Sequence, residues 1–226
     1  MAATRAFLFD LDGTLVDSMP HHHDAWVEWY ARRGLVMDAH GFFASTAGRS
    51  NAEILADLFP RLSVEQHVAM ADEKEALYRE RAARSLALIN GAKAFVDGSR
   101  GAGVALAVCT AATPENMALA FGLHGIDSWV QTVVSPADGL RGKPHPDIFL
   151  EAARRLRIAP AHCIAFEDAP LGVEAARRAG MPAVALTTTL PAQAFAEFPN
   201  VLATHADFTA LNPFTLIALT KEQHHA

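Results

Sequence analysis

Short apolar runs recur along the chain, and polar or helix-forming segments separate them. The runs cover residues 7–11, 104–109, 130–134, 163–166 and 183–186, with a shorter one at 201–203. Runs that are apolar at almost every position are typical of strands buried on both faces of a parallel sheet. Helical segments at 147–157 and 170–178 have the length of crossovers between parallel strands. The pattern predicts an α/β fold with a doubly wound parallel sheet and residues 201–203 as an edge strand.

The interval between the first two apolar runs breaks this alternation. From about residue 18 to residue 85, no run resembles a strand, and apolar side chains such as Ala25 and Trp29 recur at helical spacings. Gly34 and Pro60 mark turns within the interval. The interval is therefore predicted to be a helical insertion.

The insertion divides the chain into two parts. We expect a helical cap at residues 17–86 and an α/β core formed by residues 1–16 and 87–226. A further helix at about 91–101 leads back into the sheet.

The composition supports a folded globular protein. Hydrophobic residues make up 51% of the 226 residues, and a chain of this length buries about 70% of the surface that it exposes when unfolded. This content excludes disorder of the whole chain. No apolar run approaches the roughly 20 residues that a membrane-spanning helix needs, so the sequence predicts no membrane partner.

The charge and the cysteines narrow the function classes further. The 25 acidic and 19 basic residues give a net charge of −6, whereas nucleic-acid binding requires clustered Lys and Arg. Cys109 and Cys163 each lie inside an apolar run, which predicts small buried side chains instead of a disulfide or a zinc site. Residues 1–5 lack a basic segment followed by an apolar stretch, so we expect a cytoplasmic protein.

Two carboxylates follow the first apolar run. Asp10 and Asp12 share one side of an extended chain, and at the carboxyl end of a parallel strand they would face the crevice where α/β proteins bind ligands. A plain Asp-Gly turn, with Asp10 as a cap of the strand end, is the alternative interpretation.

Further polar side chains follow the other predicted strands. Thr110 ends the run at 104–109, Lys143 lies in a Gly-Lys-Pro-His-Pro loop, and Glu167 and Asp168 follow the run at 163–166. Because the carboxyl ends of parallel strands meet at one edge of the sheet, these groups are expected to converge there. This convergence favours a binding site over a simple turn.

In order and spacing, these motifs resemble those of the haloacid dehalogenase-like hydrolases. The resemblance is to the subgroup with a helical cap after the first motif, which includes β-phosphoglucomutase and sugar-phosphate phosphatases. It is carried by Asp-Leu-Asp-Gly-Thr-Leu-Val-Asp-Ser at 10–18, Thr110, Lys-Pro-His-Pro at 143–146 and Phe-Glu-Asp-Ala-Pro-Leu-Gly at 166–172. It implies a Rossmann-like core and phosphoryl-transfer chemistry.

The resemblance also implies roles for the motif residues. The implied catalytic residues are Asp10, Asp12, Thr110 and Lys143, and the implied Mg²⁺ ligands are Asp10, Asp12, Glu167 and Asp168. Asp10 would be the nucleophile that forms an aspartyl-phosphate, and Asp12 the general acid and base that also binds the metal through its backbone carbonyl. Lys143 would neutralise the nucleophile and the phosphoryl group, whose oxygens Thr110 would hold. Carbon–halogen cleavage needs no protonated leaving group, so Asp12 disfavours dehalogenation.

Substrate contacts are expected mainly from the cap. The candidates are His22, Arg49, Ser50, Asn51 and Lys74, together with Ala111 beside Thr110. For the cap residues, a solvated helix face or turn is an equally weighted interpretation. Asn51 stands where β-phosphoglucomutase has an arginine that grips a second phosphate. Arg49, two residues earlier, could replace that arginine or serve a different substrate, so the resemblance does not establish mutase activity.

The sequence as a whole predicts a magnesium-dependent phosphatase. It would act on a small phosphorylated sugar or polyol, as a monomer or weak homodimer with no nucleic-acid partner. The alternative enzyme is a hexose-phosphate mutase of the β-phosphoglucomutase type, which would return the phosphoryl group to a sugar. A protein that binds phosphorylated metabolites without turnover is the alternative from another class.

Overall fold

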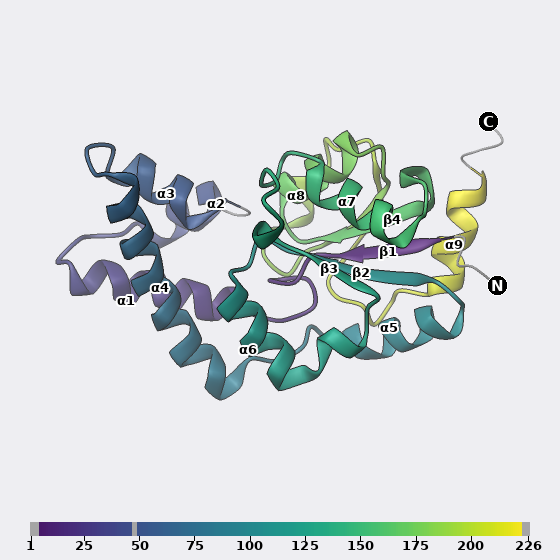
Figure 1. The fold of residues 1–226 in the computed structure, drawn as a ribbon, viewed down its shortest axis with the longest axis horizontal. Coiled ribbons are helices and arrows are strands. Elements are labelled where there is room, and N and C mark those ends of the chain that lie inside the picture. The colour runs from purple at the N-terminus through teal and green to yellow at the C-terminus, as the bar shows by residue number, and fades with distance from the viewer. Residues whose placement is uncertain (1–4, 47–48, 223–226) are drawn as a thin grey trace.

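Within residues 5–46 and 49–222, which the computed structural model describes, six parallel strands form one sheet in the order β3-β2-β1-β4-β5-β6 (Figure 1). The strands are β1 (Ala6–Phe9), β2 (Ala105–Cys109), β3 (Thr132–Val134), β4 (Cys163–Glu167), β5 (Ala183–Leu186) and β6 (Val201–His205). The order runs outward in both directions from β1, as expected of a doubly wound sheet. The prediction of this fold class is confirmed.

Helices cover both faces of the sheet. Alternate residues of each strand point to opposite faces, and because both sets of side chains are mainly apolar, both faces are buried. On one face, Phe7 and Phe9 pack with side chains of α5 (Ala92–Gly101), α6 (Pro114–His124) and α9 (Pro213–Glu222). On the other, Ala6 and Leu8 pack with α7 (Asp147–Leu156) and α8 (Pro170–Arg178). Four short 3₁₀ helices lie in the connections, at Ile126–Ser128, Pro136–Asp138, Pro160–His162 and Ala192–Phe195. The strands are therefore buried on both sides, as their apolar runs predict.

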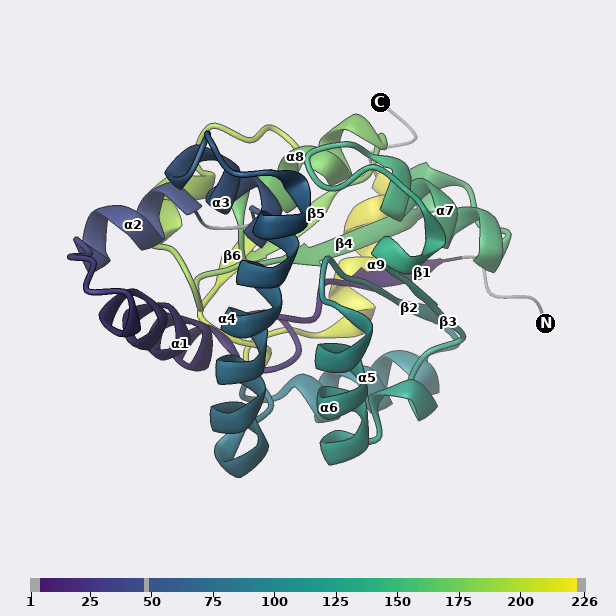
Figure 2. The same ribbon diagram turned by 60° about the vertical axis from the view of Figure 1, so that its left-hand side comes forward.

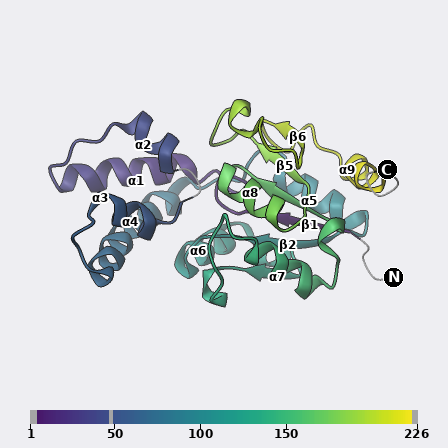
Figure 3. The same ribbon diagram turned by 90° about the horizontal axis from the view of Figure 1, so that it is seen from above.

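In the described part of the interval between β1 and α5, which leaves out residues 47 and 48, four helices lie to one side of the sheet (Figures 1 and 3). These cap helices are α1 (Met19–Arg32), α2 (Ala39–Thr46), α3 (Asn51–Leu58) and α4 (Val64–Ser85). Trp29, Leu55 and Tyr78 are buried among them. Ser50 and Ser63 begin α3 and α4 with capping boxes, in which each serine hydroxyl accepts from a backbone N–H three residues later. The helical insertion is thus observed.

The two connections between the cap helices and the sheet lie side by side. Val16 and Leu88 form an antiparallel bridge, the backbone N–H of Asp17 donates to Ala87 O, and that of Ile89 donates to Leu15 O. Paired linkers of this kind are compatible with a cap that moves as one unit. The limits of the cap at residues 17 and 86 stay a prediction.

The first strand is shorter than predicted. It ends at Phe9 instead of Leu11, because the backbone N–H groups of Thr14, Leu15 and Val16 fold back onto Leu11 O. This loop also requires the positive φ of 73° at Gly13. Asp10 and Asp12 consequently leave the sheet in a loop and do not share a strand face.

The end of the chain also differs from the prediction. The segment after residue 191 includes the helix α9, and the edge strand β6 reaches His205 instead of Ala203. Among the described residues, no helix is long and apolar enough to cross a bilayer. Residues 1–4, on which the expectation of no export signal partly rests, lie outside the described ranges.

Candidate active site

A cavity of about 1060 Å³ lies between the carboxyl edge of the sheet and the cap helices. It is lined by every site residue predicted from the sequence, namely Asp10, Asp12, His22, Arg49, Ser50, Asn51, Lys74, Thr110, Ala111, Lys143, Glu167 and Asp168. The core contributes through the connections that follow β1, β2, β3 and β4, and the cap contributes through α1, α3 and α4. The predicted convergence of strand ends is therefore observed.

Three buried carboxylates lie together at the floor of this cavity, and two of them pair with one ammonium group. Asp10, Glu167 and Asp168 each place an oxygen within 4.8 Å of the others. Lys143 Nζ lies 2.5 Å from Asp10 Oδ1 and 2.6 Å from Glu167 Oε1. The cluster thus holds more negative than positive charge.

The pKa values of the cluster reflect this imbalance. Burial raises the pKa of Asp10, and it raises the pKa of Glu167 to about 8 and that of Asp168 to about 7. The negative charges of Asp10 and Glu167 outweigh burial at Lys143 and raise the pKa of its ammonium. A divalent cation with a preference for oxygen ligands, such as Mg²⁺, would supply the missing charge. The donor set therefore fits the metal that the sequence predicts.

Two glycines leave the space that these carboxylates occupy. A Cβ atom added at Gly172 would lie 2.0 Å from Glu167 Cδ, and one added at Gly13 would lie 2.1 Å from Asp168 Oδ2. The hydroxyl of Thr189 donates to Asp168 Oδ2 on the same side. Thr189 follows β5 in a loop with no marker in the sequence, and sequence reasoning missed it.

Asp12 lies apart from the three grouped carboxylates and contacts the cap. Its Oδ1 is 3.6 Å from His22 Nε2. Burial would raise the pKa of Asp12, but the neighbouring His22 outweighs burial and lowers it. The metal role predicted for Asp12 uses its backbone carbonyl and stays a prediction.

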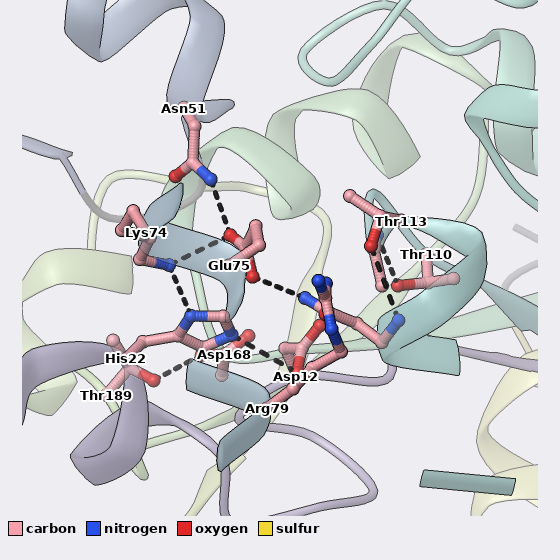
Figure 4. Close-up of polar contacts among 12 residues, drawn as sticks. Asp12, His22, Asn51, Lys74, Glu75, Arg79, Thr110, Thr113, Asp168 and Thr189 are labelled. Carbon is pink, nitrogen blue, oxygen red and sulfur yellow. Dashed lines mark hydrogen bonds and ion pairs between the residues drawn. The ribbon is translucent and has the colours of Figure 1, made fainter. Parts of the chain in front are cut away.

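His22 and Lys74 continue this contact into the cap (Figure 4). Lys74 Nζ lies 2.6 Å from His22 Nδ1. The other ring nitrogen of His22, Nε2, faces Asp12, so the imidazole lies between Lys74 and Asp12. His22 stacks on Tyr78, with ring centroids 3.8 Å apart, which fixes the plane of the imidazole.

Glu75 is a buried carboxylate of the cavity that sequence reasoning missed. Its Oε1 accepts from Lys74 Nζ at 2.9 Å and from Asn51 Nδ2 at 2.5 Å, and its Oε2 accepts from Asn116 Nδ2 at 2.5 Å (Figure 4). Burial would raise the pKa of Glu75, but Lys74 and Asn116 outweigh it and lower the pKa to about 2. Asn116 belongs to α6 of the core, so Glu75 joins the cap to the core.

The remaining predicted residues have different surroundings. The backbone N–H of Ala112 donates to Thr110 Oγ1 at 3.0 Å, which leaves the hydroxyl proton for an acceptor in the cavity. Arg49 pairs with Asp57 at 2.6 Å. Ser50 caps α3, so its contacts fit the structural role that the sequence analysis gave as the alternative to substrate binding.

Comparison with known proteins agrees with this arrangement. Residues 4–180 match the model of the haloacid dehalogenase-like hydrolase family. Validoxylamine A 7'-phosphate phosphatase of Streptomyces hygroscopicus subsp. limoneus is 34% identical over 193 residues, which cover 84% of this chain and 89% of that protein. Hexitol phosphatase A of Escherichia coli (strain K12) is 34% identical, with coverage of 80% and 82%.

A solved structure has the same fold over almost the whole chain. It is a haloacid dehalogenase-type hydrolase of family IA, variant 3, from Entamoeba histolytica HM-1:IMSS. It superposes with a TM-score of 0.88 at 25% identity and covers 96% of this chain and 99% of its own. The likeness therefore includes the cap helices as well as the sheet.

Proposed function

The chain belongs to the haloacid dehalogenase-like hydrolases, and we propose that it is a magnesium-dependent phosphatase acting on a small phosphorylated sugar or polyol. The observation that carries this proposal is the buried cluster of Asp10, Glu167, Asp168 and Lys143 on the floor of the cavity. Two relatives, each 34% identical, are named as phosphatases, one of a hexitol and one of validoxylamine A 7'-phosphate.

Asp10 is proposed as the nucleophile. Its Oδ1 accepts from Lys143 Nζ at 2.5 Å, a contact that favours the ionised carboxylate and partly offsets burial, and Asp10 lines the cavity. A carboxylate oxygen would form a bond to phosphorus while the bond between phosphorus and the ester oxygen breaks, which gives an aspartyl-phosphate. Lys143 and the Thr110 hydroxyl would hold the phosphoryl oxygens as this occurs.

Asp12 is proposed as the acid and base of the reaction. In the resting site its pKa is low, and the arriving phosphoryl charge would raise that pKa and allow the carboxyl group to take up a proton. Asp12 would give this proton to the departing alcohol. It would then accept a proton from the water that attacks the aspartyl-phosphate, which releases inorganic phosphate and restores Asp10.

The metal would be held by residues of the same cluster. We propose Asp10 and Asp168 as direct ligands, Glu167 as a direct or water-mediated one, and the Asp12 backbone carbonyl as another. When bound, Mg²⁺ would neutralise phosphoryl charge and orient the ester for attack.

The cap is proposed to select the substrate. His22, Asn51 and Lys74 face the cavity opposite the nucleophile and offer polar groups to the alcohol part of the ester. Asn51 donates to Glu75 and carries no charge, so the position where β-phosphoglucomutase has an arginine holds no cation here. This difference favours hydrolysis over the mutase alternative.

Phosphate release from a panel of phosphorylated sugars, polyols and nucleotides tests the proposal. The panel is run with Mg²⁺ and with a chelator, and Asp10→Asn serves as the blank. We expect metal-dependent release from one or two preferred esters. Release that is equal with and without chelator, or equal in Asp10→Asn, would overturn the proposed mechanism. Isomer formation without release would favour the mutase.

A further inference from the structure

The ammonium group of Lys74 is neutralised inside the cavity. Its side chain is 2% exposed, and Nζ lies 2.9 Å from Glu75 Oε1. Its other near contact is His22 Nδ1 at 2.6 Å. Lys74 is therefore a cation of the cap that is already paired before any ligand arrives.

Glu75 is held in this pair by neutral donors. The amides of Asn51 and Asn116 donate to its two oxygens, each at 2.5 Å. The Asn116 side chain is itself held in place, because its Oδ1 accepts from Arg79 Nη1 at 3.1 Å. A carboxylate with partners on both oxygens cannot turn away to release Lys74 without breaking several hydrogen bonds.

The cavity as a whole has a deficit of positive charge. Among the described residues that line it, acidic side chains outnumber Lys and Arg by six to three. The acidic ones are Asp10, Asp12, Asp72, Glu75, Glu167 and Asp168, and the basic ones are Arg49, Lys74 and Lys143. Lys143 serves the floor, and Arg49 pairs with Asp57. A divalent metal and one phosphoryl group would use the charge available at the floor. The cap half offers no unpaired cation among these residues.

We infer that Glu75 is a specificity-determining residue that reserves the cap half of the cavity for an uncharged, hydroxyl-bearing group and rejects a second phosphate. The inference rests on the proposed function for the position of the first phosphate at the floor. Hydroxyl groups can donate to carboxylate and amide oxygens. A second phosphate would find Lys74 already paired with Glu75 and would add negative charge to a cavity that already holds more carboxylates than Lys and Arg side chains. The substrate class is thereby narrowed to monophosphates of neutral sugars or polyols.

The test compares the binding of two probes that differ by one phosphate. Fructose 1-phosphate and fructose 1,6-bisphosphate are titrated calorimetrically with Mg²⁺ into Asp10→Asn, which blocks turnover, and into Asp10→Asn carrying Glu75→Gln. Glutamine has the shape of glutamate, and its carbonyl oxygen can still accept from Lys74 and Asn51. Its NH₂ group cannot accept from Asn116, so the substitution removes the charge and one hydrogen bond. We expect Asp10→Asn to bind the monophosphate at least tenfold more tightly, and Glu75→Gln to reduce that preference at least tenfold.

Glu73→Gln is the matched control. Glu73 lies on the same helix and loses the same charge, but it pairs with Arg33 and does not line the cavity. It should leave the preference unchanged within twofold. The affinity for the monophosphate reports whether each variant is folded. The comparison of the two esters in Asp10→Asn alone does not depend on how Glu75→Gln folds.

Three results would overturn the inference. They are equal or tighter binding of the bisphosphate when Glu75 is present, an unchanged preference in Glu75→Gln, and failure of both esters to bind. Because binding is measured without turnover, the proposed function can fail separately. If the protein releases no phosphate from the panel but its variants show the expected change in preference, the role of Glu75 in specificity stands and the proposed phosphatase activity is wrong.

Discussion

The Asp10 carboxylate contacts Lys143, lies beside two further buried carboxylates and lines the cavity. We predict that Asp10→Asn lowers the turnover of any substrate by at least about a thousandfold. The change is nearly isosteric and removes one of several crowded negative charges, so the melting temperature should not fall. Phosphate release and thermal unfolding measured on the same preparation check this. Retained turnover would contradict the role of Asp10 as nucleophile.

Gly172 permits a second test at the level of one atom. A methyl group in Gly172→Ala would overlap the Glu167 carboxylate, with Cβ 2.0 Å from its Cδ. We expect a loss of about 1–3 kcal/mol in the free energy of unfolding from overpacking. The Mg²⁺ concentration for half-maximal activity should rise about tenfold as Glu167 moves.

Gly122→Ala is the control for that substitution. Gly122 is exposed on α6, and an added Cβ would meet no atom within 4 Å. Alanine favours a helix over glycine by about 1 kcal/mol, so stability should hold or rise while the Mg²⁺ dependence stays the same. An equal Mg²⁺ response in both variants would show that the position of Glu167 does not set metal affinity.

The sequence predicts site residues where the topology of a parallel sheet determines their position. Asp10, Thr110 and Asp168 each follow a buried strand, and Glu167 is the last residue of one. Parallel strands end at one edge of the sheet, so these residues are brought together. Glu75 lies in the middle of a polar helix with many other charged residues. Its contact with Asn116, which belongs to a helix far away in the sequence, distinguishes it from them. The hydrophobic and polar pattern around Glu75 does not predict a contact with a residue so far away in the sequence.

At the scale of elements, α4 of the cap and α6 of the core lie side by side (Figure 2). Asn116 of α6 donates to Glu75 and accepts from Arg79, both on α4. We predict that Asn116→Ala weakens the closed arrangement of the cap, because it leaves the buried Glu75 Oε2 without its donor. The KM for the preferred sugar ester should rise about tenfold, while turnover of p-nitrophenyl phosphate changes less than threefold.

Glu115→Gln provides the comparison for this substitution. Glu115 is the exposed neighbour of Asn116 on the same helix turn. Its substitution should leave both kinetic values within twofold. Equal losses on the sugar ester and on p-nitrophenyl phosphate in Asn116→Ala would point to damage to the floor of the site and against a role in holding the cap.

Elements followed the hydrophobic pattern where burial was complete. The sequence predicts the apolar runs and α8 (Pro170–Arg178) closely, because both sheet faces are covered and Pro and Gly mark the turns. The end of β1 was placed too late, since the loop at Gly13 folds back through hydrogen bonds to Leu11. Helix α9 was not predicted, because its packing against α5 depends on contacts between distant segments.

At the scale of the whole molecule, the fold gathers acidic groups that the unfolded chain keeps apart. Burial raises the pKa of Glu167 from 4.5 to about 8 and that of Asp168 from 3.8 to about 7. Without metal, the folded protein therefore keeps protons that the unfolded chain has already released. A group of this kind contributes stability below its unfolded pKa, and that contribution is lost as pH rises through its folded pKa.

Magnesium should reverse this loss, which gives a prediction that combines metal and pH. In chelator, the melting temperature should fall between about pH 5 and pH 8, the window set by these two carboxyls. The proposed site would bind Mg²⁺ through the ionised carboxylates of the folded form, so the stabilising effect of Mg²⁺ should be larger at about pH 8 than at about pH 6. Calorimetric melting with and without Mg²⁺ across this range measures the difference directly.

Asp168→Asn separates the cluster from the other titrating groups of the chain. The amide keeps the shape of the side chain but removes one proposed ligand charge, so the melting temperature in chelator should depend less on pH. The gain from Mg²⁺ should shrink at both pH values, because fewer ionised oxygens remain to bind it. A gain from Mg²⁺ that is independent of pH in the unsubstituted protein would mean that the ion binds elsewhere. The acidic floor of the cavity would then need another cation to hold its carboxylates together.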